Sequence, residues 1–316
     1  MPYDAEISRK HPAAFVFVID QSSSMNDAFN NTRRTLAGFL ARSVNDALRE
    51  LVNQCTRGDE QVRDYFHVAA LGYSDGKVRN VWKDTEDFFL PISRVADAPL
   101  RIETVTIKVP DPDGKMRDEE VESEVWFEPV AVGDTPMVEA LKKTRDIVAA
   151  WVKEHPASFP PIVFHVTDGE PTDGDPEPVA NEIKALTTWD GAVLLFNLHV
   201  SRETGKEVVF PSDEATLPDV YAKKLFRMSS EIPEPLRPAV AESYETTATS
   251  RFFGFKAGTD TIAHFFQIGT RPANAPVYVA PADAEPAAPA PAEPAPAQPT
   301  AAQPSSAQPT KEASPA

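Results

Sequence analysis

Two runs of strand-forming apolar residues constrain the fold most strongly, because an aspartate ends each of them. Residues 14–20 read AFVFVID, and residues 161–167 read PIVFHVT and lead directly into Asp168. A continuous apolar run of this length is typical of a strand buried on both faces of a parallel sheet. We therefore expect an α/β protein in which two central strands each deliver a carboxylate to the edge of the sheet.

Helix-like and strand-like segments alternate around these two runs. Residues 32–55 place apolar side chains three and four positions apart, the spacing of an amphipathic helix. Further helices are expected at 136–153, 176–188, 215–230 and 259–268, and further strands at 65–73, 78–82, 192–200 and 251–255. This alternation predicts a doubly wound, Rossmann-like fold with a mostly parallel central sheet flanked by helices.

Two segments do not follow this alternation of helices and strands. Residues 100–128 alternate apolar and polar positions on either side of Asp-Pro-Asp-Gly at 111–114, which predicts an inserted β-hairpin. Five acidic residues on its second arm form either a solvated face or a contact for a basic partner: Asp118, Glu119, Glu120, Glu122 and Glu124. From about Ala280 the chain is almost entirely Ala, Pro, Gln, Ser and Thr. We expect one domain over residues 1–275 and a disordered Ala/Pro-rich tail over 276–316.

Composition narrows the classes of partner and compartment. The 316 residues carry a formal net charge of −17, which disfavours binding to nucleic acid or to an anionic membrane surface. No stretch approaches the roughly 20 apolar residues that cross a bilayer, and the first residues lack the apolar core of a signal peptide. The one cysteine, Cys55, reads as a buried core thiol. A cytoplasmic location is therefore expected.

Oxygen-donor side chains follow the two central strands. Asp20, Ser22 and Ser24 stand directly after the first strand, at alternate positions of a loop. One carboxylate and two hydroxyls are hard donors that suit Mg²⁺ or Mn²⁺ better than Zn²⁺. An Asp-x-Ser-x-Ser string is weak evidence alone, because Asp and Ser are also common in loops and helix caps.

Two further segments strengthen the case for a cation site. Thr135 lies in Gly-Asp-Thr-Pro just before a predicted helix, and Asp168 lies in Val-Thr-Asp-Gly after the second strand. In a doubly wound sheet, loops that follow the carboxyl ends of the strands converge in one crevice. Asp134 is a candidate for outer support of such a site through hydrogen bonds to the ligands.

This set of motifs, in this order, resembles the metal-ion-dependent adhesion site (MIDAS) of the von Willebrand factor A (VWA) superfamily, over roughly residues 10–270. The similarity is strongest to bacterial intracellular members, including those of tellurite-resistance clusters. The resemblance implies one divalent cation, Mg²⁺ or else Mn²⁺ or Ca²⁺, held by Asp20, Ser22, Ser24, Thr135 and Asp168. It also implies an open coordination position that an Asp or Glu of a protein partner completes, with AAA-type ATPases or kinase and phosphatase proteins as partner classes.

The resemblance implies a non-catalytic adaptor, and two alternatives stay open beside it. One is a Mg²⁺-dependent phosphoryl-transfer hydrolase, although Ser22 stands where a haloacid-dehalogenase-type phosphatase has its second aspartate. The other is a degenerate VWA scaffold that binds no metal. His165 and His199 lie within strand-like runs and are expected to be core residues with hydrogen-bond partners rather than metal ligands.

Overall fold

The computed structural model describes residues 3–29, 34–56, 61–110, 115–201 and 205–270, and it contains an eight-stranded sheet. The strands follow the order β3-β2-β1-β7-β8-β10-β9, and β4 pairs with β2. The parallel strands are β1 (Ala13–Asp20), β2 (Phe66–Ser74), β7 (Ile162–Thr167), β8 (Leu194–His199) and β10 (Phe253–Phe255). The antiparallel strands are β3 (Lys77–Asn80), β4 (Phe89–Pro91) and β9 (Val208–Val209). The predicted doubly wound, mostly parallel sheet is confirmed.

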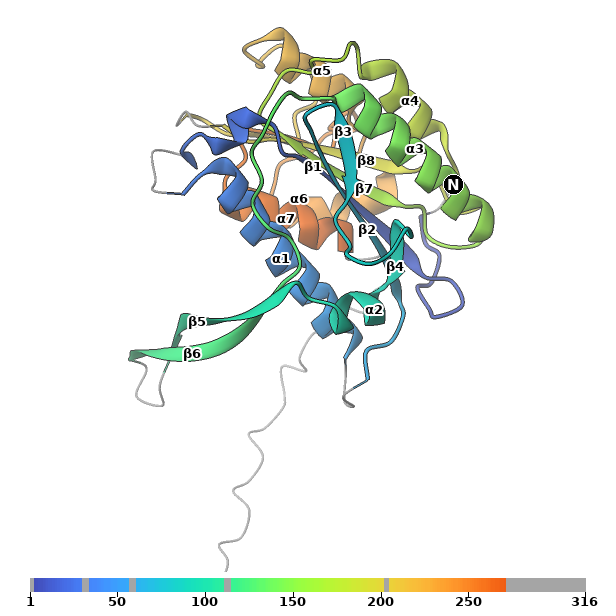
Figure 1. Ribbon diagram of the computed structural model, residues 1–316. Coiled ribbons are helices and arrows are strands. Elements are labelled where there is room, and N and C mark those ends of the chain that lie inside the picture. The colour runs from blue at the N-terminus through green and yellow to red at the C-terminus, as the bar shows by residue number, and fades with distance from the viewer. Residues whose placement is uncertain (1–2, 30–33, 57–60, 111–114, 202–204, 271–316) are drawn as a thin grey trace, which may run out of the picture. The chain divides into compact units, whose positions relative to one another are not determined.

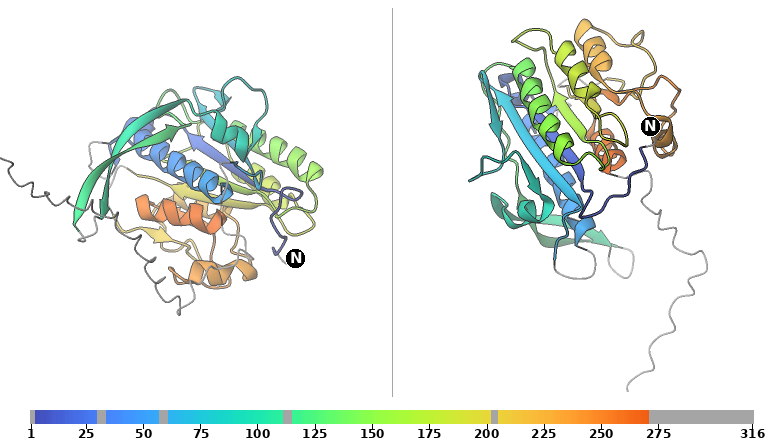
Figure 2. Two further views of the ribbon diagram at one scale, coloured as in Figure 1. Left: turned by 90° about the horizontal axis from the view of Figure 1, so that it is seen from below. Right: turned by 90° about the vertical axis from the view of Figure 1, so that its right-hand side faces the viewer.

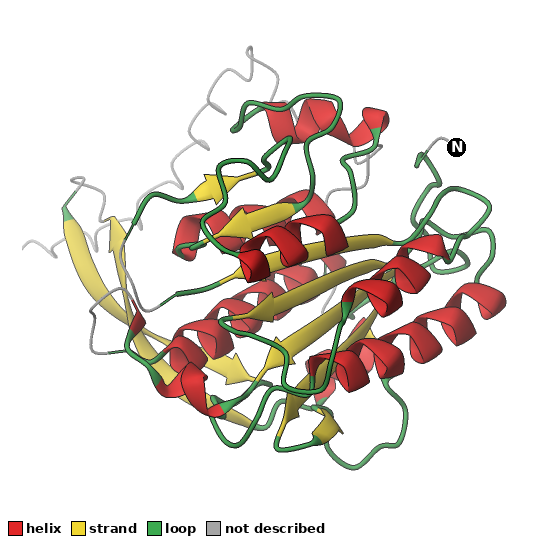
Figure 3. Cartoon of the chain, turned by 90° about the horizontal axis from the view of Figure 1, so that it is seen from above, coloured by secondary structure: helices red, strands yellow, loops and turns green. Residues whose placement is uncertain are grey.

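Helices cover both faces of this sheet (Figures 1 and 3). One face packs against α1 (Leu36–Cys55) and α7 (Thr259–Thr270), which lie side by side in Figure 2. The other face packs against α3 (Met137–Glu154), α4 (Glu177–Ala185) and α5 (Val220–Met228). None of the helices within the described residues is both long and apolar enough to cross a membrane.

The first apolar run becomes β1 because both of its faces are buried. Phe15 and Phe17 point into the core below α1 and α7, whereas Val16 and Val18 point into the core below α3 and α4. Successive side chains of a strand leave on opposite faces, so a strand between two helix layers is apolar throughout. Burial on both faces fixes β1 at the centre of the sheet. Its last residue, Asp20, lies at the carboxyl end of the strand.

Some element boundaries differ from those expected. The helix predicted over 215–230 begins only at Val220, because Pro218 disfavours helix before it and Asp219 accepts hydrogen bonds from the first free amides. Four short elements were not predicted from the sequence, because a segment of six residues or fewer shows no clear periodicity. They are β4, β9, α2 (Ile92–Asp97) and α6 (Arg237–Ala241).

The predicted insertion is a separate two-stranded antiparallel sheet, β5 (Arg101–Pro110) and β6 (Met116–Val125), which extends away from the main sheet in Figure 1. Its turn at 111–114 and the predicted tail at 276–316 lie outside the described residues. The acidic arm is partly neutralised by ion pairs, as expected of a solvated face. These pairs are Lys108–Asp118 at 2.5 Å, Arg117–Glu119 at 2.5 Å and Arg49–Glu124 at 3.4 Å.

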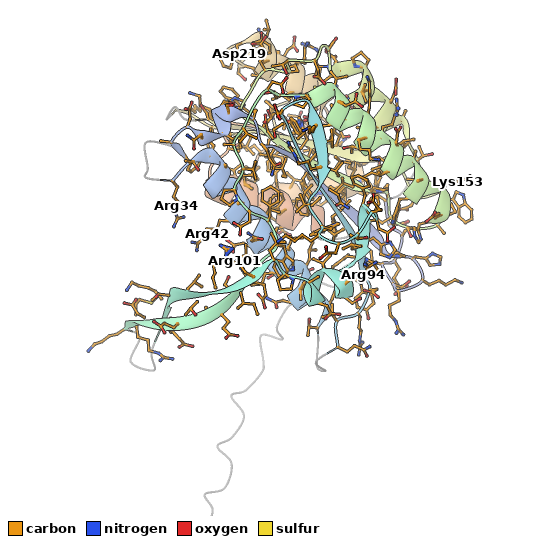
Figure 4. All side chains as sticks on the ribbon, in the orientation of Figure 1. Arg34, Arg42, Arg94, Arg101, Lys153 and Asp219 are labelled. Carbon is orange, nitrogen blue, oxygen red and sulfur yellow. The ribbon has the colours of Figure 1, made fainter. Side chains whose placement is uncertain are left out.

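The hairpin and α1 line a groove of about 660 Å³. Its rim carries Arg42 and Arg101, which Figure 4 places along α1 and at the base of the hairpin. Carboxylates accompany them: Arg42 lies 3.8 Å from Asp46, and Arg101 lies 2.9 Å from Glu103. The rim therefore mixes both signs of charge.

His165 is a core residue with two hydrogen-bond partners, as expected from its strand. It is fully buried, and its ring nitrogens lie 2.8 Å from Tyr73 Oη and 2.8 Å from Asn197 Oδ1. Burial lowers the pKa of His165 to about 4, although the Asn197 contact opposes this shift. The folded protein therefore holds His165 neutral, whereas the unfolded chain protonates it near its ordinary value of about 6.5.

We expect this histidine to make the protein acid-labile. A lowered pKa in the folded state gives stability that is present above pH 6.5 and is lost as pH falls through 4. A shift of this size corresponds to on the order of 3 kcal/mol at the acid end. Urea unfolding of wild type and His165→Gln between pH 7 and pH 4 measures it. A stability difference between the two proteins that is constant over this range would contradict the prediction.

Candidate metal centre

The two strand-end aspartates are neighbours because β1 and β7 pair in parallel. Ile19 lies opposite Val166, so Asp20 at the end of β1 comes beside the residues that lead into Asp168. The chain passes from β1 to β2 on one side, while β7 and β8 lie on the other side. Such a reversal of strand order opens a crevice at the carboxyl ends of the strands, where α/β proteins bind their ligands.

Four of the five predicted ligands form one connected group. Ser24 Oγ donates to Asp168 Oδ1 at 2.8 Å and lies 3.1 Å from Ser22 Oγ. The backbone amide of Ser22 donates to Asp20 Oδ1 at 2.9 Å. Asp20 and Ser22 are buried, Asp168 is half-buried and Ser24 is exposed. The group therefore has a buried floor and a side that faces solvent.

Thr135 joins this group through the backbone of its loop. Ser23 donates to the carbonyl of Gly133 from its amide at 3.0 Å and from its hydroxyl at 2.8 Å. Val132 N donates to Gln21 O at 2.8 Å. The Thr135 side chain is buried, and among the described residues no hydrogen bond joins its hydroxyl to the other four predicted ligands. The structure thus places Thr135 beside the site without fixing its hydroxyl to the others.

The third loop is tied to the second by reciprocal hydrogen bonds. Thr172 Oγ1 accepts from Thr135 N at 3.1 Å, and Thr172 N donates to Thr135 O at 3.0 Å. Asp173 accepts from two amides at the start of α3, Val138 N and Glu139 N, at 3.0 and 2.9 Å. This capping joins the loop after β7 to the same helix that Thr135 precedes. All three predicted loops therefore meet.

Asp134 has a different role from the outer support expected of it. Its carboxylate accepts from Gly76 N at 2.7 Å, and its carbonyl accepts from Asp75 N at 3.3 Å. Both partners belong to the turn between β2 and β3. Asp134 therefore fastens its loop to a neighbouring turn.

The two carboxylates carry uncompensated charge. Burial raises the pKa of Asp20, and hydrogen bonds from Ser22, Thr167 and Tyr73 oppose that shift. Burial and then the nearby charge of Asp20 raise the pKa of Asp168 to about 6. Within the described part of the chain, no Lys or Arg forms an ion pair with either carboxylate. A cation between them would supply the missing positive charge.

The donor set fits a hard divalent cation. It consists of two carboxylates and hydroxyls, and the described residues contain no group of three or more His, Cys, Asp or Glu arranged to hold a metal. Mg²⁺ accepts oxygen ligands and keeps several waters, so it does not require a cage of charged side chains. Asp20, Ser22, Ser24, Thr135 and Asp168 are therefore the residues that would hold it.

Sequence reasoning missed one member of this group, Thr167. It is fully buried, and its hydroxyl donates to Asp20 Oδ2 at 2.6 Å and accepts from Gly169 N at 3.1 Å. Together with the Ser22 amide, it holds both oxygens of Asp20. The signal was its place as the last residue of an apolar strand beside the predicted Asp168, where a hydroxyl is otherwise unexplained.

No protein-family model matches the sequence, and no curated protein sequence matches it. Among solved structures the chain is similar to the VWA domain of SpRpn10, with 10% identity, 70% of this chain and 83% of that chain covered, and a TM-score of 0.37. It is also similar to the adhesive tip pilin GBS104 from Group B Streptococcus agalactiae (19% identity, 51% and 47% covered, TM-score 0.25). A third similar structure is that of the human COPII-coat protein Sec24c, with 13% identity, 69% of this chain and 28% of that chain covered, and a TM-score of 0.31. The site assignment depends on this chain's own geometry.

Proposed function

We propose that this chain is a VWA-like protein-interaction module that binds a partner through one divalent cation, Mg²⁺ or else Mn²⁺ or Ca²⁺. The single observation that carries the proposal is the connected group of Ser22 Oγ, Ser24 Oγ and Asp168 Oδ1 beside the buried Asp20 carboxylate. These oxygens come from separate strand ends at the switch point of the sheet, where a ligand is expected. A cytoplasmic setting and a bacterial, tellurite-type subfamily stay predictions.

The partner chemistry follows from the open side of the site. A cation held by Ser22 and Ser24 hydroxyls and by Asp168 has few charged ligands, so it stays electron-poor and accepts another carboxylate. Because Ser24 is exposed and Asp168 is half-buried, an Asp or Glu from a partner reaches the cation from solvent. The surrounding surface supplies most of the specificity. ATPase, kinase or phosphatase partners stay predictions.

The buried state of Asp20 favours a non-catalytic module over a phosphoryl-transfer hydrolase. A nucleophilic carboxylate needs an oxygen that can reach a phosphorus atom. Asp20 is 1% exposed, and its two oxygens accept from Ser22 N and Thr167 Oγ1. The position two residues later is Ser22, which cannot act as the carboxylic general acid.

Calorimetric titration with Mg²⁺, Mn²⁺ and Ca²⁺ tests the cation site. We expect saturable one-to-one binding in wild type, and binding weaker by roughly tenfold or more in Ser22→Ala and Thr135→Val, because each variant loses one hydroxyl ligand. Ser43→Ala is the matched control, since Ser43 Oγ donates to Phe39 O within α1. Equal binding in all four proteins would place the cation elsewhere, and no binding in wild type would leave a degenerate scaffold.

A peptide array tests the partner chemistry once cation binding is established. Peptides that bind in Mg²⁺ should lose binding when their single Asp or Glu becomes Asn or Gln, and when EDTA removes the cation. Retention of a peptide in EDTA would show that its contact does not use the cation. Cleavage or dephosphorylation of a bound ligand would contradict the non-catalytic assignment.

A further inference from the structure

A pocket of about 530 Å³ lies at the same edge of the sheet as the candidate metal centre. Phe255, the last residue of β10, lines this pocket. At the end of β8, His199 O accepts a hydrogen bond from Ala257 N at 2.9 Å. At the end of β7, Thr167 O accepts from Val200 N at 3.0 Å. The carboxyl ends of β7, β8 and β10 therefore form one continuous edge, with the candidate metal centre at β7 and the pocket at β10.

Apolar side chains and two lysines line this pocket. The one carboxylate of the lining, that of Glu207, is engaged by the start of α7, since it accepts from Gly258 N at 2.6 Å and from Thr261 Oγ1 at 2.7 Å. The pocket is therefore an apolar cavity with a positive rim, on a chain whose formal net charge is −17. The apolar lining is Val208, Val209, Pro218 and Phe255, and the lysines are Lys206 and Lys256.

One segment of the chain borders both the pocket and the candidate metal centre. Pro218 lines the pocket and stands just before α5. Three residues later, the Tyr221 hydroxyl donates to the carboxylate of Glu170, which lies two residues after Asp168. The start of α5 therefore connects the wall of the pocket to the loop that carries Asp168.

Two exposed apolar side chains lie on the same edge. Val132 is 47% exposed and Val220 is 66% exposed. The amide of Val132 donates to Gln21 O at 2.8 Å, which places it among the loops of the candidate metal centre, and Val220 is the first residue of α5. A single exposed valine needs no explanation, but two of them beside an apolar pocket and a candidate cation site extend one apolar surface.

Charge selects the kind of partner segment that fits this surface. Lys206 is exposed, and in the described part of the chain no carboxylate forms an ion pair with it. The Nζ of Lys256 lies 5.9 Å from the centre of the Phe255 ring, and so faces the apolar lining. An acid beside an apolar side chain would meet both lysines, whereas a basic segment would be repelled.

We propose that this pocket receives a large apolar side chain from the same partner segment whose Asp or Glu binds the cation. The inference rests on the proposed function, and it makes the partner an extended acidic segment with an apolar anchor. β10 and β9 lie two and three strands from β7, which puts the pocket on the order of 10–15 Å from the cation. An extended chain covers about 3.3 Å per residue, so the anchor stands about three to four residues from the metal-binding acid.

Selection from a random peptide library on wild type in Mg²⁺, with elution by EDTA, tests the inference. Peptides released by EDTA should carry an Asp or Glu with Leu, Ile, Met or Phe about three to four residues away. Replacing that apolar residue by Ser should weaken binding by roughly tenfold or more, because its buried apolar surface is lost. Released peptides with no apolar residue at a recurrent distance from the acid would overturn the inference.

Two variants separate the pocket from the cation site. Thr216 lines the pocket and is exposed, so Thr216→Trp fills the pocket from its rim without entering the core, and Lys206→Glu reverses the charge of the rim. Both should leave Mg²⁺ affinity unchanged and weaken the selected peptides by roughly tenfold. Thr187→Trp is the matched control, since Thr187 is an exposed threonine that bridges Ala192 before β8, at the amino ends of the strands.

The outcomes distinguish this inference from the proposed function. Wild type that binds no Mg²⁺, or that yields no peptide on EDTA elution, would overturn both. Selected peptides that bind Thr216→Trp as tightly as wild type would leave the cation site in place and overturn the role of the pocket alone. Equal losses in Thr216→Trp and Thr187→Trp would also overturn it, because the loss would not depend on the pocket.

Discussion

Asp20→Asn is expected to abolish divalent-cation binding while the fold persists. Asparagine has the shape of aspartate, so its oxygen can still accept from Ser22 N, which now donates to Asp20 at 2.9 Å. The variant removes a full negative charge from the floor of the site, where low solvent access strengthens its attraction for a cation. We expect Mg²⁺ affinity to fall by roughly a hundredfold or more, which is about 3 kcal/mol.

Thermal unfolding with and without Mg²⁺ provides the sharpest readout of this variant. Since burial raises the pKa of Asp20, the charged form is unfavourable in the metal-free fold, and the variant should be at least as stable as wild type in EDTA. With Mg²⁺ at about 100 times the wild-type Kd, wild type gains about 2.7 kcal/mol, whereas a variant that binds a hundredfold more weakly gains at most about 0.4 kcal/mol. The order of stability therefore reverses when Mg²⁺ is added.

The matched control is Asp190→Asn. Asp190 is another buried aspartate whose carboxylate accepts from a backbone amide, Asp4 N, at 3.0 Å. Asp190 lies before β8, near the amino ends of the parallel strands. Asp190→Asn should therefore respond to Mg²⁺ as wild type does. Loss of the response in both variants would point to a general effect of removing buried charge. An unchanged response in Asp20→Asn would show that the site is assigned to the wrong residues.

The sequence contained enough information to predict the central strands and the convergence of the three loops. Strands buried on both faces are apolar throughout, so their ends stand out where a polar residue interrupts the run, as Asp20 does. Parallel strands deliver their carboxyl ends to one edge, so Asp20 and Asp168 were expected to be close before any contact was known. Their meeting is therefore a consequence of strand direction.

Contacts that depend on strand register were not predictable in this way. Thr167 reaches Asp20 because Ile19 lies opposite Val166, and Tyr73 reaches His165 across the intervening β1. Sequence periodicity gives the face of a strand but not which residue of a neighbour lies beside it. Contacts between a strand and a helix were equally unpredictable: His67 of β2 and His155 at the end of α3 are far apart in the sequence, yet their rings lie 5.1 Å apart.

Gly133→Ala is expected to destabilise the protein and to weaken cation binding together. Gly133 has a φ of +67°, and a Cβ added there would lie 2.6 Å from Asp75 Cβ and 2.7 Å from Asp75 Cα. Because Asp75 backbone atoms are involved, the loop itself must shift. The Gly133 carbonyl accepts hydrogen bonds from both the amide and the hydroxyl of Ser23, and Thr135 follows two residues later. We expect a loss of about 2–5 kcal/mol of stability from left-handed strain plus overpacking.

Gly76→Ala separates the strain from the collision. Gly76 has nearly the same φ, +63°, but a Cβ there meets nothing within 4 Å. It should cost only about 1–2 kcal/mol and leave Mg²⁺ binding unchanged. Urea unfolding and Mg²⁺ titration of both variants give the comparison. Equal effects of the two substitutions would mean that the contact between the Gly133 loop and Asp75 does not hold Thr135 in place. A larger effect at Gly133 on both measurements would show that this contact couples the turn after β2 to the cation site.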